Sequence, residues 1–149
     1  MDIRGYFSSK RDAVTPGVYL PERGQLIGPD DEMPDLEDGE PHVCVVQPGE
    51  TWLLETTEKF RNGDISQTRY ETLLLLQCVR EVREDEHEAP VWRDGRPLPG
   101  PAVWERADIE MLESDTHKPG GWLRQMKDAV GQYVQAAKAE LTPGKSLGG

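Results

Sequence analysis

Two acidic segments of the sequence hold the side chains best suited to bind a metal ion. Residues 84–88 read EDEHE and place His87 among carboxylates, and residues 30–40 carry seven carboxylates in eleven positions. Neighbouring acidic residues at a helix end do not converge on one ion as i, i+4 ligands do. Pro34 also breaks the fixed ligand offsets of a calcium loop. We therefore expect solvated loops without a metal, and the same holds for the isolated histidines, His42 and His117.

The sequence supports nucleophilic catalysis no better than it supports a metal site. No serine or cysteine stands in a nucleophile elbow or beside a recognisable base, and no glycine-rich loop is suited to cradle a phosphate. Cys44 and Cys78 have apolar neighbours and no CxxC spacing, which indicates reduced and packed thiols. We expect a protein with no catalytic residue and no cofactor. The competing hypothesis is a small hydrolase or metal enzyme built on residues 84–88.

The negative charge of the chain disfavours partners that are themselves anionic. Its 149 residues include 28 acidic and 17 basic side chains, a formal net charge of -11, which repels phosphate backbones and anionic lipid. The longest aliphatic run, residues 73–76, is far shorter than the roughly 20 apolar residues of a membrane span. The sequence therefore predicts no nucleic-acid and no membrane partner, and a protein that stays in the cytoplasm or in a particle assembled there.

The segment that organises the chain is RYETLLLLQCVREVR, residues 69–83, which has the widest apolar face in the sequence. We expect a helix that begins at a capping box of Asp64 and Gln67 and stays helical until the charged residues before Pro90. A helix with so wide an apolar arc is covered on more than one side. Its structural residues are expected to be Leu73, Leu74, Leu76, Cys78 and Val79.

Short β segments are expected on both sides of this helix. Residues 42–46, HVCVV, favour a strand, and a turn at residues 48–49 leads to residues 52–55, for which we prefer a strand. The alternative is a helix from Thr51 to Phe60 that stops at the Asn-Gly pair 62–63. The Asp-Gly pair at 94–95 predicts a type I′ hairpin, whose second strand is limited to a sheet edge by three prolines. Residues 108–113 are expected to be helical.

The last helix is expected to run from position 119 or 121 to Leu141. Its apolar residues recur at nearly 3.6 spacing, and its polar face carries charged and amide side chains. The apolar positions are Trp122, Met126, Val130, Tyr133 or Val134, Ala137 and Leu141. The polar positions are Arg124, Lys127, Asp128 and Gln132. The helix either covers the central helix or docks in part onto a partner.

The N-terminal third differs from the rest in composition. Residues 1–49 hold 6 of the 12 prolines and 6 of the 15 glycines, which predicts an extended, Pro/Gly-rich acidic arm over 1–41, a compact α+β domain over 42–141 and a flexible tail over 142–149. The fold class is α+β: two main helices and a short one with β-hairpins. The arm and the last helix supply the expected partner-binding residues: Tyr6, Phe7, Val18, Tyr19, Leu20, Trp122, Met126, Val130 and Tyr133.

The order of elements resembles the small tail assembly chaperones of long-tailed bacteriophages. A β region, HVCVVQPGETWLLE, precedes the leucine-rich helix TLLLLQCVREV, the turn RDGRPLPG, the segment DIEMLE and a final helix, over about residues 42–140. The resemblance implies a non-enzymatic protein that keeps the tape-measure protein soluble in the host cytoplasm while tail-tube subunits are recruited. The alternative is a structural component of the virion, a connector, completion or capsid-associated protein whose arm pairs with neighbouring subunits; homo-oligomerisation is open in both.

Overall fold

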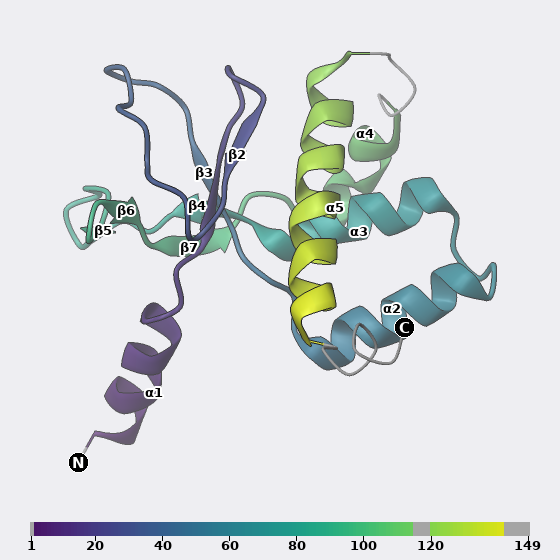
Figure 1. Ribbon diagram of the computed structural model, residues 1–149, viewed down its shortest axis with the longest axis horizontal. Coiled ribbons are helices and arrows are strands. Elements are labelled where there is room, and N and C mark those ends of the chain that lie inside the picture. Colours follow the sequence, from purple (N-terminus) through teal and green to yellow (C-terminus); the bar gives the residue numbers. More distant parts are fainter. Residues whose placement is uncertain (1, 115–119, 142–149) are drawn as a thin grey trace.

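The chain folds as a mixed α+β structure. The computed structural model describes residues 2–114 and 120–141, of which 138–141 as backbone only. Within these residues it contains five α-helices, a short 3-10 helix, a five-stranded antiparallel sheet and a separate two-stranded sheet. Helices α2 to α5 gather on one side of the molecule, and α1 projects away from the sheet at the other end (Figure 1). The expected α+β class is confirmed.

The five-stranded sheet draws its strands from most of the chain. Its order is β2-β1-β3-β4-β7, and every neighbouring pair is antiparallel. Its strands are β1 (Gly17–Leu20), β2 (Gln25–Ile27), β3 (Val43–Val45), β4 (Val79–Val82) and β7 (Pro99–Ala102). The proline-rich β7 lies at an edge, as expected of a strand that lacks amide donors.

The extended arm expected over residues 1–41 is not confirmed. Helix α1 (Ile3–Asp12) takes up its start, and β1 and β2 are integral strands of the main sheet. Both faces of β1 are covered: Tyr19 joins the main core, whereas Val18 and Leu20 pack with Ile27 in a second cluster. Met33 and Leu36 of the acidic loop close over that cluster. The prolines and glycines of this region mark the turns of a sheet.

Helix α2 (Glu50–Arg61) replaces the strand preferred for residues 52–55, so that preference is wrong and the alternative helix is confirmed. Its buried face consists of Leu53, Thr56 and Thr57, the i, i+3, i+4 spacing of a helix packed on a core. The helix stops at Asn62, followed by Gly63 with a φ of +78°, the left-handed conformation that glycine adopts most readily. A helical period of burial therefore outweighs the β propensity of the short TWLLET segment.

Helix α3 (Gln67–Cys78) is shorter than expected at both ends. Its N-cap is Ser66, whose Oγ accepts from the backbone amide of Arg69 at 3.0 Å, in place of the expected Asp64 cap. It ends at Cys78, and the next residue already begins β4. As strand β4, the charged VREVRE segment forms backbone hydrogen bonds with both β3 and β7. This pairing favours a strand over continuation of the helix.

The core forms where α3 meets the sheet and α5. Leu74, Leu75, Cys78 and Val79 are buried in it, whereas Leu73 and Leu76 are only half-buried. Both cysteines are buried and free, as expected, and burial raises the pKa of each thiol to about 12. The leucine run is therefore a core element, with its other sides against α2, α4 and α5.

The C-terminal half follows its local signals closely. Strands β5 (Trp92–Arg93) and β6 (Arg96–Pro97) form a hairpin in which Asp94 and Gly95 both have positive φ, as a type I′ turn requires. The 3-10 helix η1 (Arg106–Asp108) leads into α4 (Ile109–Ser114), and α5 spans Trp122–Leu141. These three predictions are confirmed. No helix of the described ranges combines the length and apolar character needed to cross a bilayer.

We predict opposite effects for two glycine-to-alanine substitutions. A Cβ at Gly100 would lie 3.0 Å from the Arg83 Cα and 3.1 Å from the Glu81 carbonyl oxygen, backbone atoms of the paired strand that cannot rotate away. Gly100→Ala should lower the free energy of unfolding by about 1–3 kcal/mol. Gly131→Ala, in α5 with open space around it, should raise it by about 0.5–1 kcal/mol. Urea denaturation of both variants measures this, and a stable Gly100→Ala protein would contradict the strand spacing.

Candidate functional site

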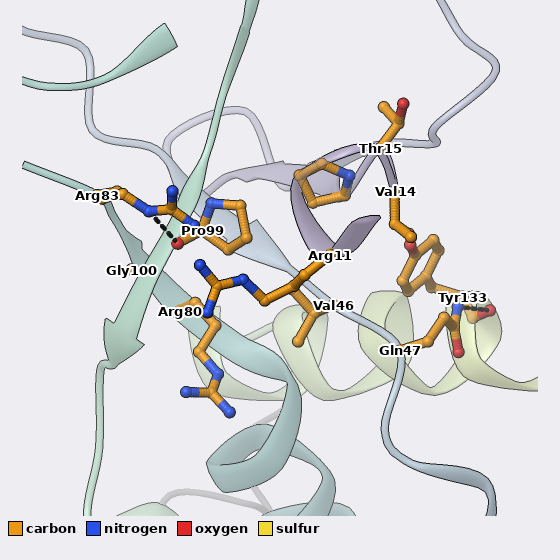
Figure 2. Close-up of a pocket in the computed structure, with 11 residues that line it drawn as sticks. Arg11, Val14, Thr15, Val46, Gln47, Arg80, Arg83, Pro99, Gly100 and Tyr133 are labelled. Carbon is orange, nitrogen blue, oxygen red and sulfur yellow. Dashed lines mark hydrogen bonds between the residues drawn. The ribbon is translucent and has the colours of Figure 1, made fainter. Parts of the chain in front are cut away.

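A pocket of about 460 Å³ lies at the base of α1, where the chain enters the sheet. Its walls come from five separate segments: the end of α1 and residues 14–16, residues 46–47 after β3, strand β4, strand β7 and helix α5 (Figure 2). Apolar side chains make much of the wall: Val14, Pro16, Val46, Pro99 and the ring of Tyr133. Only the folded sheet brings these segments together.

Three arginines line the same pocket. Arg80 and Arg83 come from β4 and its end, and Arg11 comes from the last turn of α1. Such a concentration of positive charge is notable in a chain of net charge -11. A guanidinium stays protonated at any physiological pH and has no acceptor, so these residues are suited to bind anions and not to move protons.

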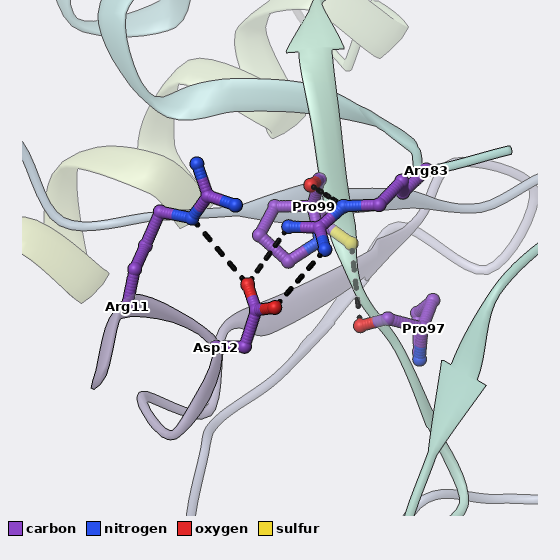
Figure 3. A network of polar contacts seen from close by, with 6 residues as sticks. Arg11, Asp12, Arg83, Pro97 and Pro99 are labelled. Carbon is purple, nitrogen blue, oxygen red and sulfur yellow. Dashed lines mark hydrogen bonds and ion pairs between the residues drawn. The ribbon is translucent and has the colours of Figure 1, made fainter. Parts of the chain in front are cut away.

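Arg83 is already occupied by an ion pair that anchors α1. Its Nη1 and Nη2 donate to Asp12 Oδ2 and Oδ1 at 3.2 and 2.9 Å, and its Nε donates to the Pro99 carbonyl at 3.2 Å (Figure 3). The hydrogen bonds from Arg83 lower the pKa of Asp12 below its usual value. Asp12 ends a helix, where the helix dipole disfavours a carboxylate, so Arg83 compensates for this and ties α1 to the sheet.

The other two guanidinium groups, those of Arg11 and Arg80, make fewer polar contacts than that of Arg83. Arg11 Nε lies 3.4 Å from Asp12 Oδ1, and its side chain is 66% exposed. The guanidinium of Arg80 has no ion pair and no hydrogen bond to any other described residue. Three arginines and one carboxylate leave an excess of two positive charges around the pocket. The arrangement is suited to bind an anion beside an apolar surface.

Two hydroxyl groups lie in the wall of the pocket, those of Tyr133 and Thr15. Burial raises the pKa of the Tyr133 phenol, so that this hydroxyl stays protonated near neutral pH. Thr15 is the other hydroxyl in the wall, and no histidine, cysteine or carboxylate lines it. The guanidinium groups and the apolar side chains of the wall are suited to bind a ligand.

An exposed apolar face on α1 is the second feature of this end of the molecule. No residue of α1 is buried, and Ile3, Tyr6 and Phe7 are 54%, 48% and 61% exposed. The two rings pack edge to face with their centroids 5.4 Å apart, and Lys10 Nζ lies 5.5 Å from the Tyr6 ring. Residues at i, i+3, i+4 and i+7 share one face of a helix, so these four side chains form one face, which we call the α1 face.

The structure divides the nine expected partner-binding residues into two groups. Tyr6, Phe7 and Trp122 are exposed, and Tyr133 is half-buried in the wall of the pocket. Five are core residues that a partner cannot reach in this fold: Val18, Tyr19, Leu20, Met126 and Val130. The first three are buried because β1 is covered on both faces, and the last two because the apolar stripe of α5 covers α3.

The acidic segments and histidines of the described residues do not assemble into a metal-binding group of three ligands. The side chain of His87 is 82% exposed and its Nε2 lies 3.6 Å from Glu86 Oε1, and His42 Nδ1 lies 2.9 Å from the Glu40 carbonyl. His117 lies outside the described residues. Glu40 instead forms a bidentate ion pair with Arg23, at 2.8 and 2.7 Å, which holds the acidic loop against the sheet.

Lys127 is a buried charge that the sequence placed on the polar face of α5. Only 2% of the residue is exposed, and its Nζ donates to Thr72 Oγ1 at 3.2 Å and to the Leu112 carbonyl at 3.0 Å. Burial lowers the pKa of this ammonium group, against the opposing attraction of Glu71 and Glu113. Lys127 thus joins α5, α3 and α4, and its solvent-facing position in the sequence pattern gave no signal of that role.

We predict that Asp12→Asn releases α1 from the sheet. The amide accepts a weaker hydrogen bond from Arg83 and carries no charge to oppose the guanidinium. Backbone ¹⁵N order parameters of residues 3–11 should fall below about 0.6, the range of flexible segments, while those of β3 stay near 0.85. Asp38→Asn, an exposed change of equal charge, is the control. Unchanged order parameters in the Asp12 variant would contradict the anchoring role.

We predict that wild type gains stability relative to Lys127→Met as the pH rises. The folded-state pKa of Lys127 lies below its usual 10.5, so the unfolded chain binds more protons between the two values and folding becomes more favourable with pH there. Urea denaturation of both proteins at pH 7 and pH 9.5 measures the difference in the free energy of unfolding. Cys44 and Cys78 titrate in both proteins and cancel. A difference independent of pH would refute the charged, desolvated state.

Comparison of the chain with protein-family models, with curated proteins and with solved structures finds no match. The chemistry of its own side chains is what indicates a role. That chemistry consists of an exposed aromatic helix face and, at the base of the same helix, guanidinium groups beside an apolar wall.

Proposed function

We propose that this chain is a non-enzymatic protein-interaction protein that docks onto a neighbouring subunit through the α1 face. The observation that carries the proposal is the state of α1 itself, a ten-residue helix with no buried residue and with Ile3, Tyr6 and Phe7 exposed. Isolated helices of this length are marginal in water. An apolar face with no cover in its own chain gains most by burial in a groove of another protein.

The composition of α1 suits such a role. Tyrosine and phenylalanine bury large areas with few rotatable bonds, and interface cores are enriched in aromatic residues. The helix carries three basic residues and one acidic residue, whereas the rest of the chain has 14 basic and 27 acidic residues. The docking element is therefore positive on a negative body. Its charge favours a groove on the partner rimmed by carboxylates.

The resemblance of the sequence to phage tail assembly chaperones leads us to propose particle assembly as the setting, although residues 50–61 are helical and residues 79–82 form a strand. In that setting the partner is the tape-measure protein or a tail-tube subunit, and the chain acts in the host cytoplasm. The projection of α1 away from the body favours the second candidate, a structural virion component that contacts its neighbour through this helix (Figure 1). Both candidates use the same helix and differ in whether the chain remains in the finished particle.

The test is site-specific cross-linking in the producing cells. A photo-reactive phenylalanine analogue at position 7 should cross-link to one predominant protein, and Tyr6→Ser should reduce that product about tenfold or more, since an interface aromatic contributes about 2 kcal/mol or more. The same analogue at Leu54, exposed on α2, is the control. No product, or equal products at both positions, would refute the proposal.

Quantitative mass spectrometry of purified mature particles separates the two settings. A chaperone should be absent from particles and cross-link to a long helical protein before assembly. A structural component should be present at a fixed ratio to the other subunits.

A further inference from the structure

We propose that the pocket at the base of α1 binds a carboxylate side chain of the partner polypeptide, with Arg80 as the principal ligand. The inference rests on the proposed function for the nature of the ligand, a polypeptide. It adds a second contact whose chemistry differs from that of the α1 face. The pocket is separate from the apolar residues of the α1 face, because none of Ile3, Tyr6 and Phe7 lines it.

The first argument is that the guanidinium groups of Arg83 and Arg80 differ in their number of polar partners. Both Nη atoms of Arg83 donate to Asp12 and its Nε donates to the Pro99 carbonyl, so Arg83 has few hydrogen-bond donors available for a ligand. Arg80 lines the same pocket, and its guanidinium has no polar partner among the described residues. Arg80 as a residue is half-buried, and a guanidinium beside an apolar wall gains from a counter-ion.

The second argument concerns the kind of anion. Arg83, one of the arginines that line the pocket, already pairs with a carboxylate in fork geometry, that of Asp12, which itself does not line the pocket. A nucleic acid or a phosphate-rich surface must bring many charges close to a chain of net charge -11, whereas an acidic side chain brings one. Charge therefore favours a single carboxylate over a polyanion.

The third argument is the apolar wall. Val14, Val46, Pro99 and the Tyr133 ring line the pocket together with the arginines, and its volume is about 460 Å³. That volume lies within the range of small-ligand sites and accommodates an acidic side chain together with an aliphatic neighbour. The fitting ligand is thus a glutamate or aspartate flanked by an apolar residue.

The test uses the full-length chain labelled with ¹⁵N and three probes. The first is a capped five-residue peptide with a central glutamate between leucines. The second has glutamine in place of the glutamate, and the third is inorganic phosphate at matched ionic strength. The arginine Nε–Hε signal of Arg80 and the amide signal of Val14 should shift and saturate with the glutamate peptide. Affinity should be at least about tenfold lower for the glutamine peptide, the range expected for loss of a charged hydrogen bond.

Variants assign the response to the pocket. Arg80→Gln should abolish saturation, and Arg80→Lys should retain part of the affinity, since it keeps the charge and loses the fork. Arg61→Gln, an exposed change of equal charge on α2, should bind as wild type does. Amide spectra of each variant establish that it is folded. If Arg80→Gln unfolds the chain, the lysine variant alone must show reduced affinity.

Three results would overturn the inference: equal binding of the glutamate and glutamine peptides, saturation by phosphate at lower concentration than by the glutamate peptide, or full binding by both Arg80 variants. The double change Ile3→Ser with Tyr6→Ser, made in the chain that carries the photo-reactive analogue at position 7, separates this inference from the proposed function. It should lose the cross-linked partner and still bind the glutamate peptide. A chain that cross-links through position 7 and binds no glutamate peptide would retain the proposed function and lose this one.

Discussion

The fold depends on the junction at which α3 becomes β4 without an intervening loop. Cys78 closes the helix, Val79 opens the strand, and neither is exposed to solvent. Two adjacent buried residues in different secondary structures fix the direction of the helix relative to the sheet. Strands β3 and β7 pair on either side of β4, and α2, α4 and α5 pack around α3. The core, the pocket and the ion pair that anchors α1 all depend on the position of that junction, because β4 also carries Arg80 and leads into Arg83.

The predictable parts of the fold were those with local signals. The Asp94–Gly95 pair dictates its own turn, and the apolar stripe of α5 repeats often enough to define a helix. The errors fall where pairing with distant residues decides the outcome. Val79 reads as helical from its neighbours, yet it faces Val45, and Val18 reads as part of a loose arm, yet it pairs with Cys44 and Ile27. Sheet register couples positions far apart in the chain, and no short window of sequence contains it.

The candidate site was less predictable than the fold. Asp12 and Arg83 are separated by 71 positions, and the sequence pattern assigns Arg80 to the polar end of a helix. Tyr6 and Phe7, predicted to bind a partner from an extended arm, are exposed on a helix instead. Lys127 is the opposite case, a residue predicted to face solvent that is buried. A periodic pattern places it on the polar face of α5 and contains no sign that α3 and α4 enclose it.

The anchoring of α1 at its C-terminal end alone sets a length scale. Its ten residues, at 1.5 Å per residue, extend about 15 Å from Asp12. A subunit that grips the far end of this helix and also contributes a side chain to the pocket must bridge that span. If the chain docks through the α1 face as proposed, the length of this helix would limit the distance between the chain and its neighbour, and an insertion of one helical turn would change that distance by about 5.4 Å.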